Sequence, residues 1–274
     1  MQPGRVLIGT SGYVYKDWRR RFYPRELPAR EWLPFYAASF RTVELNSPFY
    51  RLPRAATFRA WAGAVPAEFV FAVKASRFLT HIKRLREPGP PLTLFLGRAK
   101  GLGDARGPIL FQLPERFHLN LERLDTFLAA LARRKVRGAV LEVRHASWLI
   151  DPVFARLAAA NVALCLHDWK TQPVTGPVTA DFVYVRRHGT RRRYGGSYDD
   201  RMLREDAARV GSWAAEGRDV YVYFNNDGRA AAVRNARRLG QLVRLHGGPR
   251  TGPPFPPTVR SAPARPWRSS IAAA

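Results

Sequence analysis

The chain has 274 residues, and its 46 lysines and arginines against 21 aspartates and glutamates give a formal net charge of +25. Hydrophobic residues make up 46% and aromatic residues 12%, so the composition excludes a chain that is disordered throughout. Cys165 is the single cysteine, which excludes a disulfide within the chain and favours a reducing compartment.

Eight short apolar runs predict β-strands, and each run turns polar at its end. Parallel strands buried on both faces have this pattern when their carboxyl ends open onto a site. In chain order the predicted strands are 6–11, 42–46, 69–76, 109–114, 139–145, 163–168, 182–189 and 220–227.

Helical patterns lie between most of these runs, over residues 30–39, 55–64, 121–134, 151–160, 199–216 and 229–246. The connection after Asp168 has a weaker helical pattern than the others. Eight strands alternating with helices in about 250 residues predict a single (β/α)8 barrel of the TIM type. A doubly wound open sheet is the alternative, but no GxGxxG motif follows the first strand.

The composition changes near the C-terminus. Residues 247–274 contain seven prolines, four arginines and no acidic residue, which predicts a disordered basic tail. We therefore expect residues 1–246 to form the barrel domain.

Polar side chains at the ends of the predicted strands are the candidate site, because TIM barrels carry their chemistry at the carboxyl face. The expected catalytic residues are Glu44, Lys74, Glu142 and Asp168. The expected substrate-binding residues at strand ends and in the following loops are Thr10, Ser11, Asn46, His81, Gln112, Arg144, His145, Arg186, His188, Asn225 and Asn226.

Two carboxylates among these residues need partners. An unpaired carboxylate inside a barrel is costly, so Glu44 and Glu142 are expected to pair with Lys74, Arg144 or Arg186, or to be held protonated. The two carboxylates could divide acid and base roles in catalysis. Alternatively, they belong to a structural layer of ion pairs.

Four histidines, His81, His145, His167 and His188, fall at or after strand ends without forming an HxH or HExxH motif. Together with the acidic residues they could hold a divalent metal ion. The other interpretation is that they are core or substrate-contacting histidines. The sequence leaves the cofactor unknown.

The loop after the seventh strand carries Arg191, Arg192 and Arg193, followed by Tyr194, two glycines and Tyr198. Loops at this place in barrels often hold phosphate, which arginine binds through two nitrogens. We therefore add Arg191, Arg193 and Tyr198 to the expected substrate-binding residues. A solvated run of charge with aromatic packing is the alternative.

The excess of positive charge favours anionic partners, either an anionic small molecule or nucleic acid. The N-terminal apolar run is too short for a signal peptide, and no stretch reaches the ~20 apolar residues of a membrane helix. We expect a cytoplasmic protein that does not contact the membrane.

Eight motifs in order resemble the YecE-like family, also called domain of unknown function 72. They are GTSGYVYKDW (9–18), FYP (22–24), TVELNSPFYRLP (42–53), FAVKASRFLTH (71–81), GPILFQLP (107–114), LEVRHASW (141–148), YVRRHG (184–189) and YVYFNNDGRAAAVRNA (221–236). The resemblance implies a TIM-type barrel and supplies no reaction. Tyr13 stands where the family usually has tryptophan, and the tail lies outside the family pattern.

Three functions fit these observations. The first is an enzyme of the hydrolase or lyase type acting on an anionic, phosphate-bearing substrate at the barrel mouth. The second is a nucleic-acid-binding protein without catalysis. The third is a glycoside hydrolase, which ranks lower because an arginine-rich mouth suits an anion better than a neutral sugar.

Overall fold

The computed structural model describes residues 2–169, 176–191 and 194–245. Every strand pair in this part of the chain is parallel. One sheet has the order β1 (Val6–Thr10), β9 (Asp219–Phe224), β8 (Phe182–Arg187) and β7 (Leu166–His167). The other has the order β2 (Thr42–Leu45), β3 (Val70–Lys74), β4 (Arg106–Gln112), β5 (Ala139–Glu142) and β6 (Ala163–Leu164).

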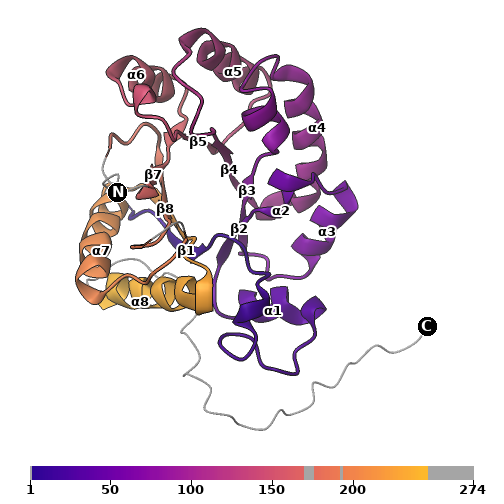
Figure 1. Cartoon of the computed structure of the whole chain (residues 1–274), viewed down its shortest axis with the longest axis vertical. Coiled ribbons are helices and arrows are strands. Elements are labelled where there is room, and N and C mark those ends of the chain that lie inside the picture. The colour runs from indigo at the N-terminus through magenta and orange to yellow at the C-terminus, as the bar shows by residue number, and fades with distance from the viewer. Residues whose placement is uncertain (1, 170–175, 192–193, 246–274) are drawn as a thin grey trace.

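The two sheets meet at both of their ends. Only Cys165 separates β6 from β7, so the predicted sixth strand joins the sheets as two short segments. At the other end Ser11 bridges Glu44 in parallel, and the Gly12 amide donates to the Glu44 carbonyl at 2.8 Å. Figure 1 shows the strands arranged in a ring, with the helices around its outside. We call this arrangement the strand ring.

The helices are α1 (Trp32–Ala37), α2 (Ser47–Tyr50), α3 (Ala55–Gly63), α4 (Gly89–Ala99), α5 (Leu121–Arg133), α6 (Asp151–Ala159), α7 (Asp200–Ala215) and α8 (Ala231–Leu245). All six predicted helices are observed, with ends that differ by up to two residues. The sequence analysis missed α2 and α4. The segment Gly89-Pro90-Pro91 looks like a break, but proline is compatible with a first helical turn, whose amides need no partner within the helix.

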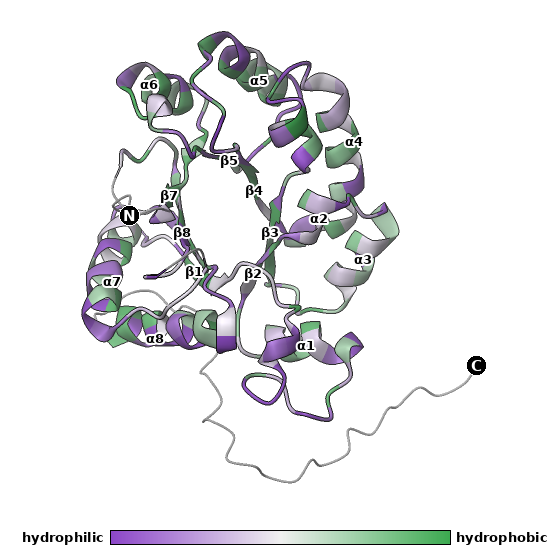
Figure 2. Cartoon of the chain, in the orientation of Figure 1, coloured by the Kyte–Doolittle hydropathy of each residue, from purple (hydrophilic) through white to green (hydrophobic). Residues whose placement is uncertain are grey.

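Two groups of buried side chains fill the molecule. The larger lies between strands and helices and includes Val43, Phe71, Phe111 and Leu141. The smaller consists of alternate strand residues such as Leu110, Tyr184 and Tyr223. Successive strand residues point to opposite faces, so the smaller group fills the inside of the ring. In Figure 2 the strands are mainly green, whereas helices α7 and α8 carry both green and purple residues.

Gly9 allows β1 and β2 to approach each other where the sheets meet. A β-carbon at this position would lie 2.3 Å from the Thr42 carbonyl oxygen. We expect Gly9→Ala to lower the free energy of unfolding by about 1–3 kcal/mol, because the two strands must move apart. Denaturant unfolding measures this loss.

Gly97→Ala is the matched control, since Gly97 lies inside α4 and a β-carbon there would have no neighbouring atom within 4 Å. It should stabilise the protein by about 0.5–1 kcal/mol through the better helix propensity of alanine. Equal effects of the two substitutions would contradict the close approach of β1 and β2.

None of the described helices is both long and apolar enough to cross a membrane. The predicted tail, residues 247–274, and the last residue of the predicted final helix, His246, lie outside the described residues.

Candidate active site

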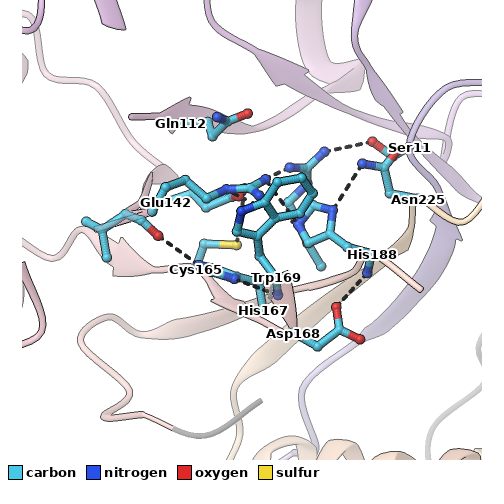
Figure 3. A network of polar contacts seen from close by, with 12 residues as sticks. Ser11, Gln112, Glu142, Cys165, His167, Asp168, Trp169, His188 and Asn225 are labelled. Carbon is cyan, nitrogen blue, oxygen red and sulfur yellow. Dashed lines mark hydrogen bonds and ion pairs between the residues drawn. The ribbon is translucent and has the colours of Figure 1, made fainter. Parts of the chain in front are cut away.

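The carboxyl ends of the strands bring charged side chains together inside the ring. The residues that carry these charged side chains occupy alternate positions of their strands. They lie on the same inward-facing side as the apolar residues that fill the rest of the ring. The inward-facing polar residues with mutual contacts are Ser11, Glu44, Glu142, Arg144, Arg186, His188 and Asn225. We call these residues the inner cluster; Figure 3 shows part of it.

Arg186, at the end of β8, joins the two carboxylates of the inner cluster. Its Nη1 donates to Glu142 Oε2 at 2.8 Å, and its Nη2 donates to Glu44 Oε1 at 2.7 Å. Nη2 also donates to Ser11 Oγ at 2.9 Å. Tyr184 completes the surroundings of Glu44 by donating its hydroxyl to Oε2 at 2.6 Å. Both carboxylates are fully buried, so Arg186 is the centre of a buried ion-pair network.

Arg144 pairs with the second oxygen of Glu142 and lies with its guanidinium 4.0 Å from the centre of the Trp169 ring. Burial alone would raise the pKa of Glu142, but Arg144 and Arg186 outweigh it and hold this pKa well below its ordinary value. His188 Nε2 lies 3.6 Å from Glu142 Oε1. Burial keeps the pKa of His188 well below its usual range, so the ring is neutral.

Lys74, at the end of β3, adds a fifth charge to a group that is already balanced. Two arginines neutralise two carboxylates, which leaves no anion for the amine. In the described part of the chain Nζ has no hydrogen-bond or ion-pair partner, and it lies 4.1 Å from the centre of the Phe49 ring. Burial lowers the pKa of Lys74 to about 7, and the nearby Arg186 adds to this effect. The amine is therefore partly neutral at pH 7.

A cavity of about 440 Å³ opens above the inner cluster. Lys74, Arg186, Asn46, Asn225 and Asp227 contribute to its wall. Two buried oxygens of these residues, Asn46 Oδ1 and Asp227 Oδ1, have no hydrogen-bond partner among the described residues. Buried polar atoms are rarely left unpaired, so these two oxygens are unsatisfied acceptors beside the cavity.

Asp227 follows β9 and is another titratable group with an unusual pKa in this wall. Burial raises its pKa to about 8, although Tyr15 and Arg186 oppose the rise. The carboxyl group is therefore mostly protonated at pH 7. The cavity thus combines a partly neutral amine with a carboxylic acid, an arrangement that suits proton transfer.

Several expected site residues face the helices instead of the ring. Thr10 donates to Tyr36 of α1, and Asn226 donates to Asn235 of α8. Asp168 accepts from the His188 amide at 2.6 Å and from the Tyr198 hydroxyl at 2.5 Å. Thr10, Asp168 and Asn226 are each one residue away from an inward-facing position, and strand alternation turns them outward. These three residues, and Tyr198 with them, hold the strand ends in place and do not join the inner cluster.

Other expected residues lie at the margin of the site. Gln112 donates to the Leu113 carbonyl and makes no contact with the cluster in Figure 3. His145 binds Ser147 and packs against His118. His81 packs edge-on against Phe49, and burial lowers its pKa to about 4. Arg191 is exposed, and Arg193 lies outside the described residues.

The sequence analysis missed the aromatic wall of the cavity. Tyr13, Tyr15, Tyr50 and Tyr194 line it, and Trp169 lies beside Arg144 and Tyr194. Tyr13 and Tyr15 belong to the first motif and Tyr50 to α2, so their positions depend on loops and on a short helix that strand patterns do not reveal.

Comparisons with known proteins assign the chain to a family. Residues 7–259 match the family described as "Protein of unknown function DUF72". The chain belongs to the DUF72 family. It is 23% identical to UPF0759 protein YunF of Bacillus subtilis, over 88% of this chain and 95% of YunF.

Solved DUF72 structures share the fold of this DUF72 protein. A DUF72 family protein of Thermotoga maritima is 26% identical, covers 89% of this chain and 99% of its own, and gives a TM-score of 0.73. A DUF72 family protein of Enterococcus faecalis is 19% identical, covers 89% of this chain and 100% of its own, and gives a TM-score of 0.72. The resemblance to this family expected from the motifs is confirmed.

Glu142, His167 and His188 are the one group in the described part of this DUF72 protein whose spacing would suit a metal ion. Their donor atoms are already engaged. His167 donates Nε2 to the Val143 carbonyl at 2.8 Å and accepts the Trp169 amide at Nδ1. Glu142 binds two arginines, whose charge opposes a second cation. These three residues therefore do not fit a divalent ion.

We expect neither Zn²⁺ nor EDTA to change the melting temperature of the purified DUF72 protein by more than about 1 °C, since no preformed ligand set is free to bind among the described residues. Thermal unfolding with each addition, and with His167→Ala as a variant that removes one donor, checks this. A rise with Zn²⁺ that His167→Ala abolishes would show that a metal can displace the present contacts.

Proposed function

We propose that this DUF72 protein is an enzyme of the lyase or hydrolase type that acts on an anionic small molecule in the cavity above the inner cluster. The proposal includes a (β/α)8 barrel of the TIM type, since the strand order and the two junctions are what such a barrel requires. It also includes the expected cytoplasmic location, which suits a protein with one buried cysteine.

One observation carries the proposal: Lys74 reaches a cavity at the carboxyl ends of the strands without an acceptor for its amine in the described part of the chain. A structural ion-pair layer would have needed no fifth charge. Keeping a lysine there costs stability, because burial disfavours its charged form. Groups with such pKa values gather at functional sites.

The roles of the charged residues follow from their contacts. Glu44 and Glu142 position Arg186 and Arg144, since both carboxylates are buried and form ion pairs with these arginines. Lys74 and Asp227 face the cavity and exchange protons with a bound molecule. Asn46, Asn225 and Arg186 orient it. The glycoside hydrolase mechanism finds less support, because it needs one of the paired carboxylates to be a proton donor.

Protection of Lys74 tests the proposal. The native protein is treated at pH 7 with trinitrobenzenesulfonate, which modifies neutral amines, in the presence of inorganic phosphate, pyruvate or neutral glycerol. We expect an anion to slow the modification of Lys74 while leaving the exposed Lys100 unchanged. If Lys74 reacts at the same rate with and without every anion, the cavity does not bind anions and the proposal fails.

Nucleic-acid binding is the second candidate, and the net charge of +25 favours it. It predicts an affinity that falls steeply with salt, since phosphate contacts release counterions. Replacing Arg191 by glutamate should then flatten the dependence of log K on log salt, whereas Lys74→Met should leave that slope unchanged. Gel-shift titrations with a single-stranded oligonucleotide at two salt concentrations distinguish this candidate from the enzyme.

A further inference from the structure

The amine of Lys74 has the position and the surroundings of a nucleophile. The residue is 8% exposed, and Nζ borders the cavity over the Phe49 ring. An amine that serves only as a positive charge would be expected to contact an anion, and none of the described carboxylates lies within ion-pair distance. Desolvated lysines next to other cations are the ones that attack carbonyl carbons.

From this geometry we infer that Lys74 forms a covalent imine with the carbonyl carbon of a small 2-oxo acid bound in the cavity. The inference rests on the proposed function and names the substrate class for that site. The cavity of about 440 Å³ is in the range of small-molecule sites, and its tyrosines and asparagines can contact the rest of the substrate.

Charge balance explains why the carbonyl compound is an acid. The inner cluster is neutral, because Arg144 and Arg186 balance Glu44 and Glu142. An iminium ion at Lys74 adds one positive charge in a buried place. A carboxylate on the same substrate, attached directly to the imine carbon, supplies the missing negative charge, whereas a neutral ketone leaves the charge unpaired.

The reaction balances with the groups present in the wall. The neutral Lys74 amine attacks the carbonyl carbon as the C=O π bond breaks, and one proton passes from the nitrogen to the alkoxide oxygen to give the neutral carbinolamine. The carbinolamine hydroxyl then takes a second proton from the Asp227 carboxyl and leaves as water, while the nitrogen lone pair forms the C=N bond of the iminium ion. Water returns a proton to Asp227, so the net change is uptake of one proton and loss of one water. Asp227 is suited to this role because it lines the same cavity as Lys74 and its raised pKa of about 8 keeps the carboxyl protonated at pH 7.

Reductive trapping tests the inference. The native full chain is incubated at pH 7 with pyruvate or 2-oxoglutarate and cyanoborohydride, which reduces an imine to a stable secondary amine. Peptide mapping is straightforward because the chain has six lysines: Lys16, Lys74, Lys83, Lys100, Lys135 and Lys170. Acetone, which carries the same ketone without the carboxylate, is the neutral control.

We expect a single reduced adduct on Lys74, formed at least about tenfold faster than on any other lysine, because an amine with an ordinary pKa is about 10³-fold less deprotonated at pH 7. Acetone should react with Lys74 more slowly than pyruvate. Asp227→Asn should slow adduct formation by about 10²-fold, the usual contribution of a general acid, and Lys74→Arg should abolish the adduct.

Two outcomes overturn the inference that Lys74 forms an imine. A third outcome, given last, also contradicts the proposed function. If the oxo acids protect Lys74 from trinitrobenzenesulfonate but leave no adduct after reduction, the site binds anions without an imine, and only the covalent step is wrong. If adducts spread evenly over the six lysines, or acetone equals pyruvate, Lys74 has no special reactivity toward oxo acids. Absence of both protection and adduct contradicts the inference together with the proposed function.

Discussion

Replacing Arg186 by leucine is expected to lower the free energy of unfolding by about 3–5 kcal/mol, because removing one partner of a buried ion pair leaves uncompensated charge. Arg186 contacts Glu142, Glu44 and Ser11 at 2.7–2.9 Å. Leucine would therefore leave Glu44 without its arginine and Glu142 with Arg144 alone. Urea denaturation at pH 7 followed by tryptophan fluorescence measures the loss.

Arg5→Leu is the matched control for this experiment. Arg5 also forms an ion pair, with Asp219 at 2.6 Å, but its side chain is 66% exposed. Solvent screens such a pair, so its loss should cost less than about 1 kcal/mol. Should Arg186→Leu prevent folding, Arg186→Lys keeps the charge and is expected to give an intermediate loss, since lysine cannot reach both carboxylates in the same way. Similar losses for Arg5→Leu and Arg186→Leu would contradict the buried network.

Replacing Lys74 by methionine is expected to stabilise the protein at pH 7 by about 2–4 kcal/mol while abolishing imine formation. The folded state holds the pKa of Lys74 at about 7, well below its value in the unfolded chain. The unfolded chain therefore binds this proton more tightly, and the stability of the native protein rises with pH between about 7 and 10. Below pH 7 the full penalty of burying the amine is present, and methionine removes it.

The pH dependence provides the sharper measurement. Arg186, Arg144, Glu142 and Glu44 are the charged groups that act on Lys74 within the ring, and His81 lies on its outer side. Asp227, with its raised pKa of about 8, makes stability fall as pH rises from about 4 to 8, so its slope opposes that of Lys74 below pH 8. Between pH 8 and 10 Lys74 should contribute a rise in the unfolding free energy of up to about 1.4 kcal/mol per pH unit. Burial raises the pKa of the Cys165 thiol well above its ordinary value, so this thiol opposes the rise in the upper part of the window. Lys74→Met should therefore lower the slope relative to the native protein over this window.

Lys100→Met is the control for a lysine at the surface, and it should change stability by no more than about 0.5 kcal/mol at either pH. A Lys74→Met variant that loses stability at pH 7 would show that the amine is charged and paired in the native state. A variant that keeps the slope between pH 8 and 10 would assign that slope to another group.

Strand patterns in the sequence predicted the fold better than they predicted the site. Runs such as 42–46 and 182–189 identify β2 and β8 because a strand buried on both faces is almost continuously apolar. The same runs place Glu44 and Arg186 at carboxyl ends, and their pairing was among the expected contacts. Two residues of opposite charge at the same end of the ring suffice for that prediction.

The expected and the observed site differ mainly in the direction in which side chains at the strand ends point. Asp168 and Thr10 lie at strand ends, but each is adjacent to the inward residue, His167 or Ser11. Alternation turns Thr10 toward Tyr36 of α1 and Asp168 toward Tyr198, which precedes α7. Applying the two-residue period from the apolar interior upward would have separated inward from outward positions. That separation requires knowing which residues of each strand end point inward. The strands β6 and β7 are too short for the sequence pattern to show this.

The cavity wall could not be predicted because it depends on long-range folding of loops. Tyr15 and Tyr194 come from segments far apart in the chain, and both line the same space. The pKa values of Lys74 and Asp227 likewise depend on burial by these loops, which no local pattern records. Asp227 lies at an expected strand end, but its burial and raised pKa are visible only in the structure.

The rate of Lys74 acylation by acetic anhydride as a function of pH, read by peptide mapping, shows whether the buried amine is reactive near neutral pH. Competition among the six lysines of one protein sample provides the internal reference. We expect the reactivity of Lys74 to reach half its maximum near its lowered pKa of about 7, with the exposed lysines following the ordinary value of about 10.4. A midpoint for Lys74 that coincides with those of the exposed lysines, or no reaction at any pH, would contradict this expectation.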